Sequence, residues 1–207
     1  ITLKPLINLF KIKKQVAQAP KPRNPEPPKP RKPKRALVLY SGGLDSRLVV
    51  RLLQEQKFQT EALHFALPFG CGCCNTACNF HFTQKEKVKM TILDVTKGTL
   101  LKEYLKILKN PKHGRGSGIN PCRDCKIFMF KKAKEYADKN KIDIIATGEV
   151  TDQRPMSQTP GAMKIIDEEI GFKITRPLID LGIHGRSRQK QMALAKKFKI
   201  KYPSPGG

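Results

Sequence analysis

Apolar residues occur along this chain in two alternating patterns, short unbroken runs and helical spacing. Five apolar runs are predicted to be strands, at 36–40, 62–66, 91–95, 142–146 and 172–175. Between them, apolar residues recur every three or four positions, which predicts helices around 48–53, 100–108, 122–139, 163–170 and 188–198. Strands alternating with helices imply an α/β fold. We expect a doubly wound parallel sheet of five strands, with its ligand at the carboxyl ends of the strands.

Residues 1–35 differ from the rest of the chain in composition. They hold 8 of the 16 prolines, 11 lysine or arginine residues and one acidic residue, Glu26. Such a segment cannot build an apolar core, so we predict a disordered or extended basic arm at 1–35 and a single domain at 36–207. The arm could grip RNA, tether the domain, act as a transit segment or be a solvated linker. We also expect further sequence beyond one or both ends.

The chain is strongly basic, with 41 Lys and Arg against 17 Asp and Glu and a formal net charge of +24. Such a surface attracts polyanions, of which nucleic acid and anionic lipid are the common ones. No run of 18 apolar residues occurs, so no membrane span is expected. Nucleic acid is the predicted partner, in the cytoplasm, or in an organelle matrix if the arm is a transit segment.

The turn after the first predicted strand has the composition of a phosphate-binding loop. It consists of Ser41, Gly42, Gly43, Leu44, Asp45 and Ser46. The glycines allow close approach to the backbone, and N–H groups at the start of the following helix attract an anion. Asp45 would repel bare phosphate, so we interpret it as a ligand of Mg²⁺, directly or through water. The turn has neither a Walker A ending nor a dinucleotide-binding fingerprint.

The six cysteines form two clusters, which indicates metal or redox chemistry rather than a disulfide framework. The first cluster is Cys71, Cys73, Cys74 and Cys78. It could bind Zn²⁺, joined by His64 and His81, or line the site as free thiols. The second, Cys122 and Cys125, could carry persulfide sulfur, ligate an iron–sulfur cluster or be structural.

The six-residue turn resembles the SGGxDS signature of the PP-loop ATP pyrophosphatases, the adenine-nucleotide alpha-hydrolase family. Blocks at 118–126, 146–150, 153–158, 176–178 and 185–188 are similar to the tRNA 4-thiouridine synthase-like group of sulfurtransferases. The resemblance covers residues 36–207. It implies the HUP-type form of the fold, with ATP and Mg²⁺ bound at the turn and tRNA as the substrate.

The resemblance also implies a reaction in two steps. A uridine oxygen attacks the α-phosphate of ATP and expels pyrophosphate, and sulfur then displaces AMP from the base. Asp45, Cys122 and Cys125 are the implied catalytic residues. The sulfur donor is sulfide or a cysteine desulfurase, acting through a cysteine persulfide or a [4Fe-4S] cluster. Related enzymes use a third cysteine as cluster ligand; here the chain stops at Gly207, where it is expected, so Cys71, Cys74 and Cys78 are further candidate ligands.

Other residues are assigned to the nucleotide. His64 and Phe65 end the second strand at the rim where the family meets adenine. Thr147 and Gly148 end the fourth strand, where Gly148 would let the nucleotide approach. The next residue, Glu149, could accept hydrogen bonds or assist Mg²⁺. Cationic groups that could offset phosphate charge are Lys126, Arg154, Arg176, Arg186 and Arg188, of which Arg154 is assigned to the cofactor site.

Two other functions stay open from the sequence. One is another PP-loop reaction, such as amide or nitrile formation on a small molecule. The other is a non-catalytic RNA-binding subunit that kept the fold without the chemistry.

Overall fold

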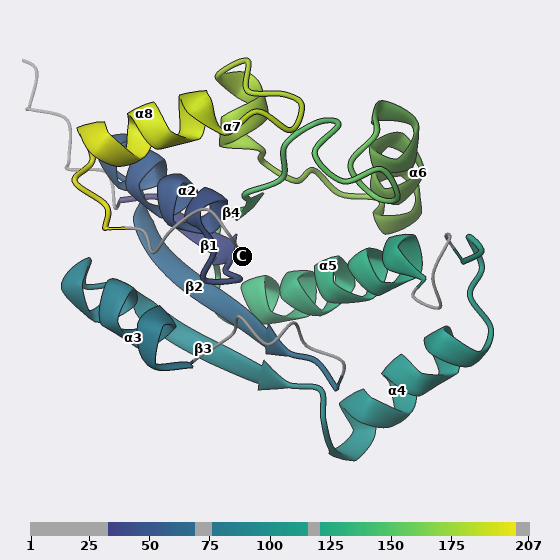
Figure 1. The fold of residues 1–207 in the computed structure, drawn as a ribbon. Helices are drawn as coiled ribbons and strands as arrows, with labels where there is room; N and C mark the ends of the chain where they lie inside the picture. The colour runs from purple at the N-terminus through teal and green to yellow at the C-terminus, as the bar shows by residue number, and fades with distance from the viewer. Residues whose placement is uncertain (1–32, 69–75, 116–120, 202–207) are drawn as a thin grey trace, which may run out of the picture. The chain divides into compact units, whose positions relative to one another are not determined.

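The strands form one parallel sheet with helices on both faces (Figure 1). The computed structural model describes residues 33–68, 76–115 and 121–201, all within the second of two units, Ile1–Lys32 and Pro33–Gly207. The elements are β1 (Arg35–Leu39), α2 (Leu44–Glu55), β2 (Gln59–Ala66), α3 (Thr76–Lys85), β3 (Lys89–Asp94), α4 (Gly98–Lys109), α5 (Cys122–Lys139), β4 (Ile144–Thr147), α6 (Pro160–Ile170), α7 (Pro177–Asp180) and α8 (Gln189–Lys197). Most of the predicted arm, together with Cys71, Cys73, Cys74 and the side chain of Cys78, lies outside the described residues.

The strand that carries the predicted phosphate turn lies inside the sheet, whose order is β3-β2-β1-β4. Leu37 of β1 pairs with Glu61 of β2 on one side and with Ile145 of β4 on the other. The run around Leu37 is continuously apolar because both faces of β1 are covered by helices. The chain passes to one side of β1 first and later to the other. The carboxyl end of β1 is therefore the point where open α/β sheets bind ligands.

The prediction of five strands is wrong for the described residues, which form four. The segment predicted as the fifth, 172–175, makes a single parallel bridge between Thr175 and Ala146. Thr175 donates its N–H to Ile145 and accepts one from Thr147, at 2.9 and 3.0 Å. The pairing ends there because Pro177, two residues later, has no N–H to donate to β4. Pro177 is also the first residue of α7, so the chain leaves the sheet at this point. The segment extends the sheet beside β4 without forming a ladder.

The core has two layers, one on each face of the sheet. On one face, α2 buries Leu44, Leu48 and Leu52 against β1 and β2, and α8 packs beside it through Ala195 and Phe198. On the other face, α5 and α6 cover the sheet with a second buried cluster that includes Leu37, Leu63, Phe130, Ala133 and Ile166. Each fully buried Leu or Phe stabilises the fold by about 1.5–3 kcal/mol. The two layers fix the position of the turn between them.

The helix boundaries show which local signals decided them. α6 begins after Thr159, whose hydroxyl accepts a hydrogen bond from the N–H of Ala162, and ends at Gly171 with φ 71°. α5 covers the predicted range 122–139, whereas α3 and α7 have no counterpart in the prediction. Of the helices in the described part of the chain, none combines the length and the apolar character that crossing a membrane requires.

Candidate functional site

The turn between β1 and α2 is an open strand-to-helix corner. Gly42 has φ 84°, a conformation that favours glycine, and Gly43 is the N-cap residue of α2. Ser46 ties the corner together, because its hydroxyl donates to the carbonyl oxygen of Gly43 at 2.8 Å. Ser41 and Gly43 are exposed. Because Gly43 has no side chain to cap α2, the first N–H groups of the helix are offered to an anion.

A buried arginine supports the corner from below, and the sequence patterns did not single it out. Arg47 donates from Nε to the carbonyl oxygen of Gly42 at 2.9 Å. Its guanidinium lies 5.3 Å from the ring centroid of Phe82, which stacks on Tyr40 at 6.2 Å. The hydrogen bond holds Gly42 in its positive-φ conformation, and the guanidinium adds positive charge beneath the turn. The one sequence feature that could have indicated this role is the position of Arg47, directly after the turn and in the first turn of α2.

Asp45 has one carboxylate oxygen paired and one unpaired. Oδ2 accepts a hydrogen bond from Nε2 of Gln153 at 3.1 Å, while Oδ1 is buried without a hydrogen-bond partner among the described residues. Burial raises the pKa of the Asp45 carboxyl, opposed by the hydrogen bond from Gln153 and by the charges of Arg188 and Arg154. A buried carboxylate oxygen with no donor fits a hard cation such as Mg²⁺, which prefers oxygen ligands. The residues present are therefore compatible with the predicted Mg²⁺ site.

Gly148 brings the end of β4 against the turn. A Cβ added there would lie 2.8 Å from the carbonyl carbon of Asp45 and 2.9 Å from the amide nitrogen of Ser46. The absent side chain therefore admits the backbone of α2, a packing role distinct from the predicted approach of a nucleotide. Thr147 is buried beside it, and its hydroxyl accepts the N–H of Glu149 at 2.9 Å. These contacts lock the β4 end and the phosphate turn into one unit.

Two of the predicted phosphate-binding cations are paired with an internal carboxylate. Glu149 is buried, and its two oxygens accept from Nζ of Lys126 and, at 2.9 Å, from Nε of Arg176. Arg176 also holds Asp167 with both terminal nitrogens, at 2.9 and 2.7 Å. This network joins α5, the β4 end, α6 and the start of α7. Lys126 and Arg176 thus position the elements around the site, and Glu149 is engaged with them.

The remaining predicted cations lie on the segments that border the turn. Arg154 and Arg186 are exposed and Arg188 is half-buried. The charges of Arg154 and Arg188 reach Asp45, as their effect on its pKa shows. The segment with Arg186 and Arg188 is tied to the β4 side by a parallel bridge at Thr151 and by the N–H of Gly185, which donates to Thr151 at 2.7 Å. The structure therefore brings Arg154 and Arg188 to the turn.

The side chains of His64 and Phe65 are used within the fold. His64 is buried, and its Nδ1 lies 2.9 Å from the carbonyl oxygen of Tyr40, the residue before the turn. Phe65 is half-buried and packs against the cluster of Val95, Tyr104 and Phe128. A contact with adenine at this strand end stays a prediction, and it would have to be made by backbone groups.

Cys122 and Cys125 are free thiols on the first turn of α5, three residues apart and so on one helix face. The hydroxyl of Tyr104 lies 3.3 Å from Sγ of Cys125. Burial raises the pKa of the Cys125 thiol, although the hydrogen bond with Tyr104 lowers it. No group of three or more His, Cys, Asp or Glu suited to a metal occurs among residues 33–68, 76–115 and 121–201. Two cysteines do not complete a cluster, and the side chains of the other candidate cluster ligands, Cys71, Cys74 and Cys78, fall outside the described part.

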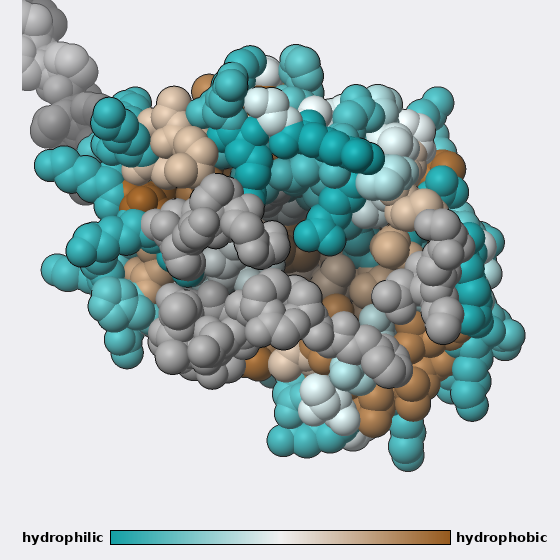
Figure 2. Space-filling view, in the orientation of Figure 1, coloured by the Kyte–Doolittle hydropathy of each residue, from teal (hydrophilic) through white to brown (hydrophobic). Residues whose placement is uncertain are grey.

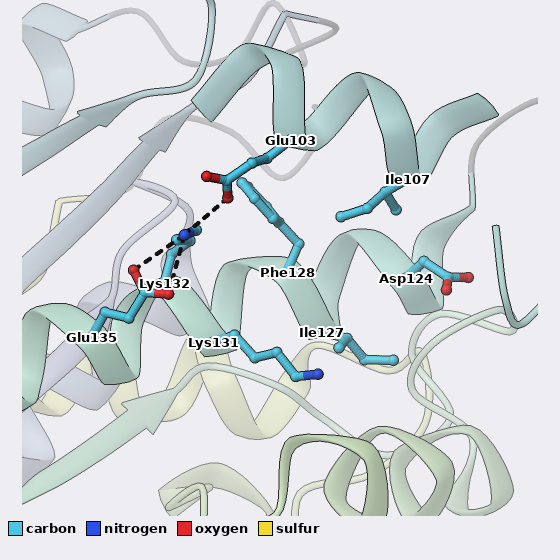
Figure 3. A pocket seen from close by; sticks show the side chains of 8 residues that line it. All are labelled: Glu103, Ile107, Asp124, Ile127, Phe128, Lys131, Lys132 and Glu135. Atoms are coloured by element: carbon cyan, nitrogen blue, oxygen red, sulfur yellow. Dashed lines mark hydrogen bonds and ion pairs between the residues drawn. The ribbon is translucent and has the colours of Figure 1, made fainter. Parts of the chain in front are cut away.

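A hollow of about 300 Å³ between α4 and α5 is separate from this site (Figure 3). Its wall consists of Glu103, Ile107, Asp124, Ile127, Phe128, Lys131, Lys132 and Glu135. Lys132 lies between Glu103 and Glu135, with its ammonium 2.9 and 3.1 Å from their carboxylates. No residue of the phosphate turn lines this hollow. Its lining carries three carboxylates and two ammonium groups, so it offers little to a nucleotide.

The sequence of this chain matches a known family over most of its length. The family is described as thiamine biosynthesis protein (ThiI), and the match covers residues 32–200. The chain belongs to the ThiI family. The predicted membership in the PP-loop tRNA sulfurtransferase group is thereby confirmed.

Relatives of this ThiI-family chain include proteins named for tRNA thiolation. A probable tRNA sulfurtransferase of Finegoldia magna is 32% identical over 157 residues, which cover 70% of this chain and 36% of the relative. The tRNA-specific 2-thiouridylase MnmA of Petrotoga mobilis is 28% identical over 130 residues, which cover 56% of this chain and 35% of the relative. The chain thus spans about a third of the length of these curated relatives.

A solved structure shares the fold of this ThiI-family chain. It is a 4-thiouridine synthetase in complex with RNA and bound ATP, with a TM-score of 0.60 and 20% identity. The similarity covers 79% of this chain and 40% of that one. At this identity the likeness concerns the fold alone, and it confirms the predicted PP-loop type of parallel α/β sheet.

Proposed function

We propose that this chain is the ATP-dependent activating domain of a tRNA uridine sulfurtransferase. It would bind ATP and Mg²⁺ at residues 41–46, transfer AMP to a uridine oxygen, and allow sulfur to replace that oxygen. The observation that carries the proposal is the open corner at Gly43, with the unpaired Oδ1 of Asp45 beside it. The names of two relatives, a probable tRNA sulfurtransferase and a tRNA-specific 2-thiouridylase, support a tRNA base as the acceptor.

The first step needs positive charge near the phosphates and a fixed geometry. N–H groups at the start of α2 would bind the pyrophosphate portion, and Arg47 would keep Gly42 in place below it. Asp45 would hold Mg²⁺ through Oδ1, and the ion would offset the charge of the leaving pyrophosphate. Arg154 and Arg188 flank Asp45 and are the cations available to the α-phosphate. The uridine oxygen bonds to the α-phosphorus as the bond to pyrophosphate breaks.

The second step exchanges AMP for sulfur at the activated carbon. With sulfide as donor, a C–S bond forms, the C–O bond to AMP breaks, and no oxidant or reductant is consumed. If a persulfide on one of the two cysteines of α5 is the donor, the other can release the product by forming a Cys122–Cys125 disulfide. That disulfide must then be reduced by an external thiol. A cysteine desulfurase is the class of enzyme that would load such a persulfide.

The proposal is tested by changing Asp45 to Asn, which keeps the size of the side chain and removes its charge. With ATP, Mg²⁺, tRNA and sulfide, the unaltered protein should release pyrophosphate and form a thiolated nucleoside detectable by mass spectrometry. Loss of the metal ligand should lower pyrophosphate release by about 100-fold or more. Asp138→Asn is the matched control, because Asp138 is an exposed acid that pairs with Lys134 on α5. It should retain full activity.

Two results would contradict the proposal. Full pyrophosphate release by Asp45→Asn would refute the Mg²⁺ assignment. ATP turnover by the unaltered protein that is indifferent to tRNA, but stimulated by a small metabolite, would refute the tRNA substrate and favour amide or nitrile formation instead.

A further inference from the structure

The last described segment, 181–201, carries charged side chains of one sign only. It contains no acidic residue and seven basic ones, Arg186, Arg188, Lys190, Lys196, Lys197, Lys199 and Lys201. All except the half-buried Arg188 are exposed. Arg188 aside, none of these cations has a carboxylate partner among the described residues. The segment is therefore a surface of uncompensated positive charge.

Some lysines elsewhere in the domain have an acidic partner close by. Lys134 lies 2.6 Å from Asp138, Lys97 lies 3.1 Å from Asp94, and Lys164 lies 3.9 Å from Glu168. Local pairing of this kind weakens the field that a surface presents to an approaching polyanion. Pairing of this kind cannot occur within 181–201, because this segment holds no acidic residue.

The packing of α8 holds these cations outward on a rigid support. Gln191, Ala195 and Phe198 are buried, and the last two belong to the same core cluster as α2. The opposite face of α8 must then point to solvent. Figure 2 shows hydrophilic side chains along the upper rim, where Figure 1 draws α7 and α8, with a smaller apolar group between them. Lys196 and Lys197 are in the last turn of the helix, where cations are also favoured by the helix dipole.

Both ends of this basic segment reach the phosphate turn. At its start, the charge of Arg188 acts on Asp45. At its end, the carbonyl oxygen of Lys201 accepts a hydrogen bond at 3.3 Å from Arg47, the residue that supports Gly42. A polyanion lying along α8 would therefore be beside the nucleotide, which distinguishes this surface from a merely basic one on the far side of the domain.

We propose that the surface formed by α8 and the basic residues from Arg186 to Lys201 docks the phosphate backbone of tRNA, so that the target base reaches the turn. This inference rests on the proposed function. Phosphate contacts supply most of the salt-dependent affinity of a protein for nucleic acid. Exposed lysines on a fixed helix suit such contacts, because they require no base identity.

The test compares two triple variants of the full chain with the same change in charge. Lys190, Lys196 and Lys197 are changed to Gln on α8, and Lys97, Lys134 and Lys164 are changed to Gln in the control. Each set lowers the formal net charge from +24 to +21. Binding of transcribed tRNA is measured by fluorescence anisotropy at several salt concentrations, and binding of ATP is measured separately. Residues 1–35 are present in both proteins, so their contribution cancels.

The α8 variant should bind tRNA about tenfold more weakly, and the slope of log K against log salt should fall by roughly 2–3. The control should stay within about twofold of the unaltered protein, and both variants should bind ATP normally. An equal loss of tRNA affinity in both variants, or no loss of tRNA affinity in the α8 variant, would overturn the inference while leaving the proposed function intact. If the α8 variant loses binding to vesicles of anionic lipid while its tRNA binding is unchanged, the surface binds a membrane, and the inference is overturned as well. If the unaltered protein binds ATP but no tRNA, the proposed function itself fails.

Discussion

Gly148 has no room for a side chain, and the change Gly148→Ala measures how tightly the β4 end fixes the phosphate turn. The added Cβ would meet the carbonyl carbon of Asp45 at 2.8 Å and the amide nitrogen of Ser46 at 2.9 Å, whereas ordinary contacts begin near 3.4 Å. Both atoms are backbone, so neither can rotate away. The turn and the β4 end must separate by about half an ångström, and overpacking of this kind costs about 1–3 kcal/mol.

For a domain of this size, a loss of about 2 kcal/mol lowers Tm by about 4–8 °C. The displaced turn should also bind ATP about tenfold more weakly, because its N–H groups no longer converge on the phosphates. Differential scanning calorimetry and isothermal titration with ATP measure the two effects. Gly161→Ala is the control: a Cβ at that position in α6 meets nothing within 4 Å, and alanine favours helix. Wild-type Tm and ATP affinity for Gly148→Ala would refute the packing argument.

Two further predictions concern the interior of the site. Glu149→Gln removes the charge that pairs with Lys126 and Arg176. Leaving the half-buried Lys126 without a carboxylate, and Arg176 with Asp167 alone, should cost about 3 kcal/mol in the free energy of unfolding by urea; an unchanged midpoint would show that the network is dispensable. Tyr104→Phe removes a hydrogen bond that lowers the pKa of Cys125 against the effect of burial, so that pKa should rise. Iodoacetamide labelling of the Cys125 peptide, followed by mass spectrometry, should then require higher pH, and an unchanged or lower pH midpoint would contradict the assignment.

The sequence was sufficient where one local signal dominated. The buried run before Ser41 predicted β1, and the two glycines with Asp45 predicted the corner that leads into α2. The predicted helix at 163–170 ends where α6 ends, before Gly171, whose positive φ closes the helix. These features depend on residues within a few positions along the chain, so the sequence alone is enough to predict them.

The sequence was insufficient where the partner of a side chain comes from a distant part of the chain. Lys126 and Arg176 have the right charge for phosphate, yet the fold places Glu149 between them, and no spacing along the chain reveals that pairing. No sequence pattern singles out Arg47, because the carbonyl oxygen of Gly42 comes within reach of its guanidinium only when the turn has formed. The fifth strand failed for a local reason, since Pro177 stops the ladder after one bridge.

Because β1 is bonded to a neighbour along both of its edges, the corner at its end has little freedom to adapt. Under the proposed function, a nucleotide would meet a site that is already formed, and the cost of arranging it would have been met during folding. The proposed docking surface on α8 shares the core cluster of α2, so it would be formed in advance as well. Recognition in this domain would then require little rearrangement of the corner itself.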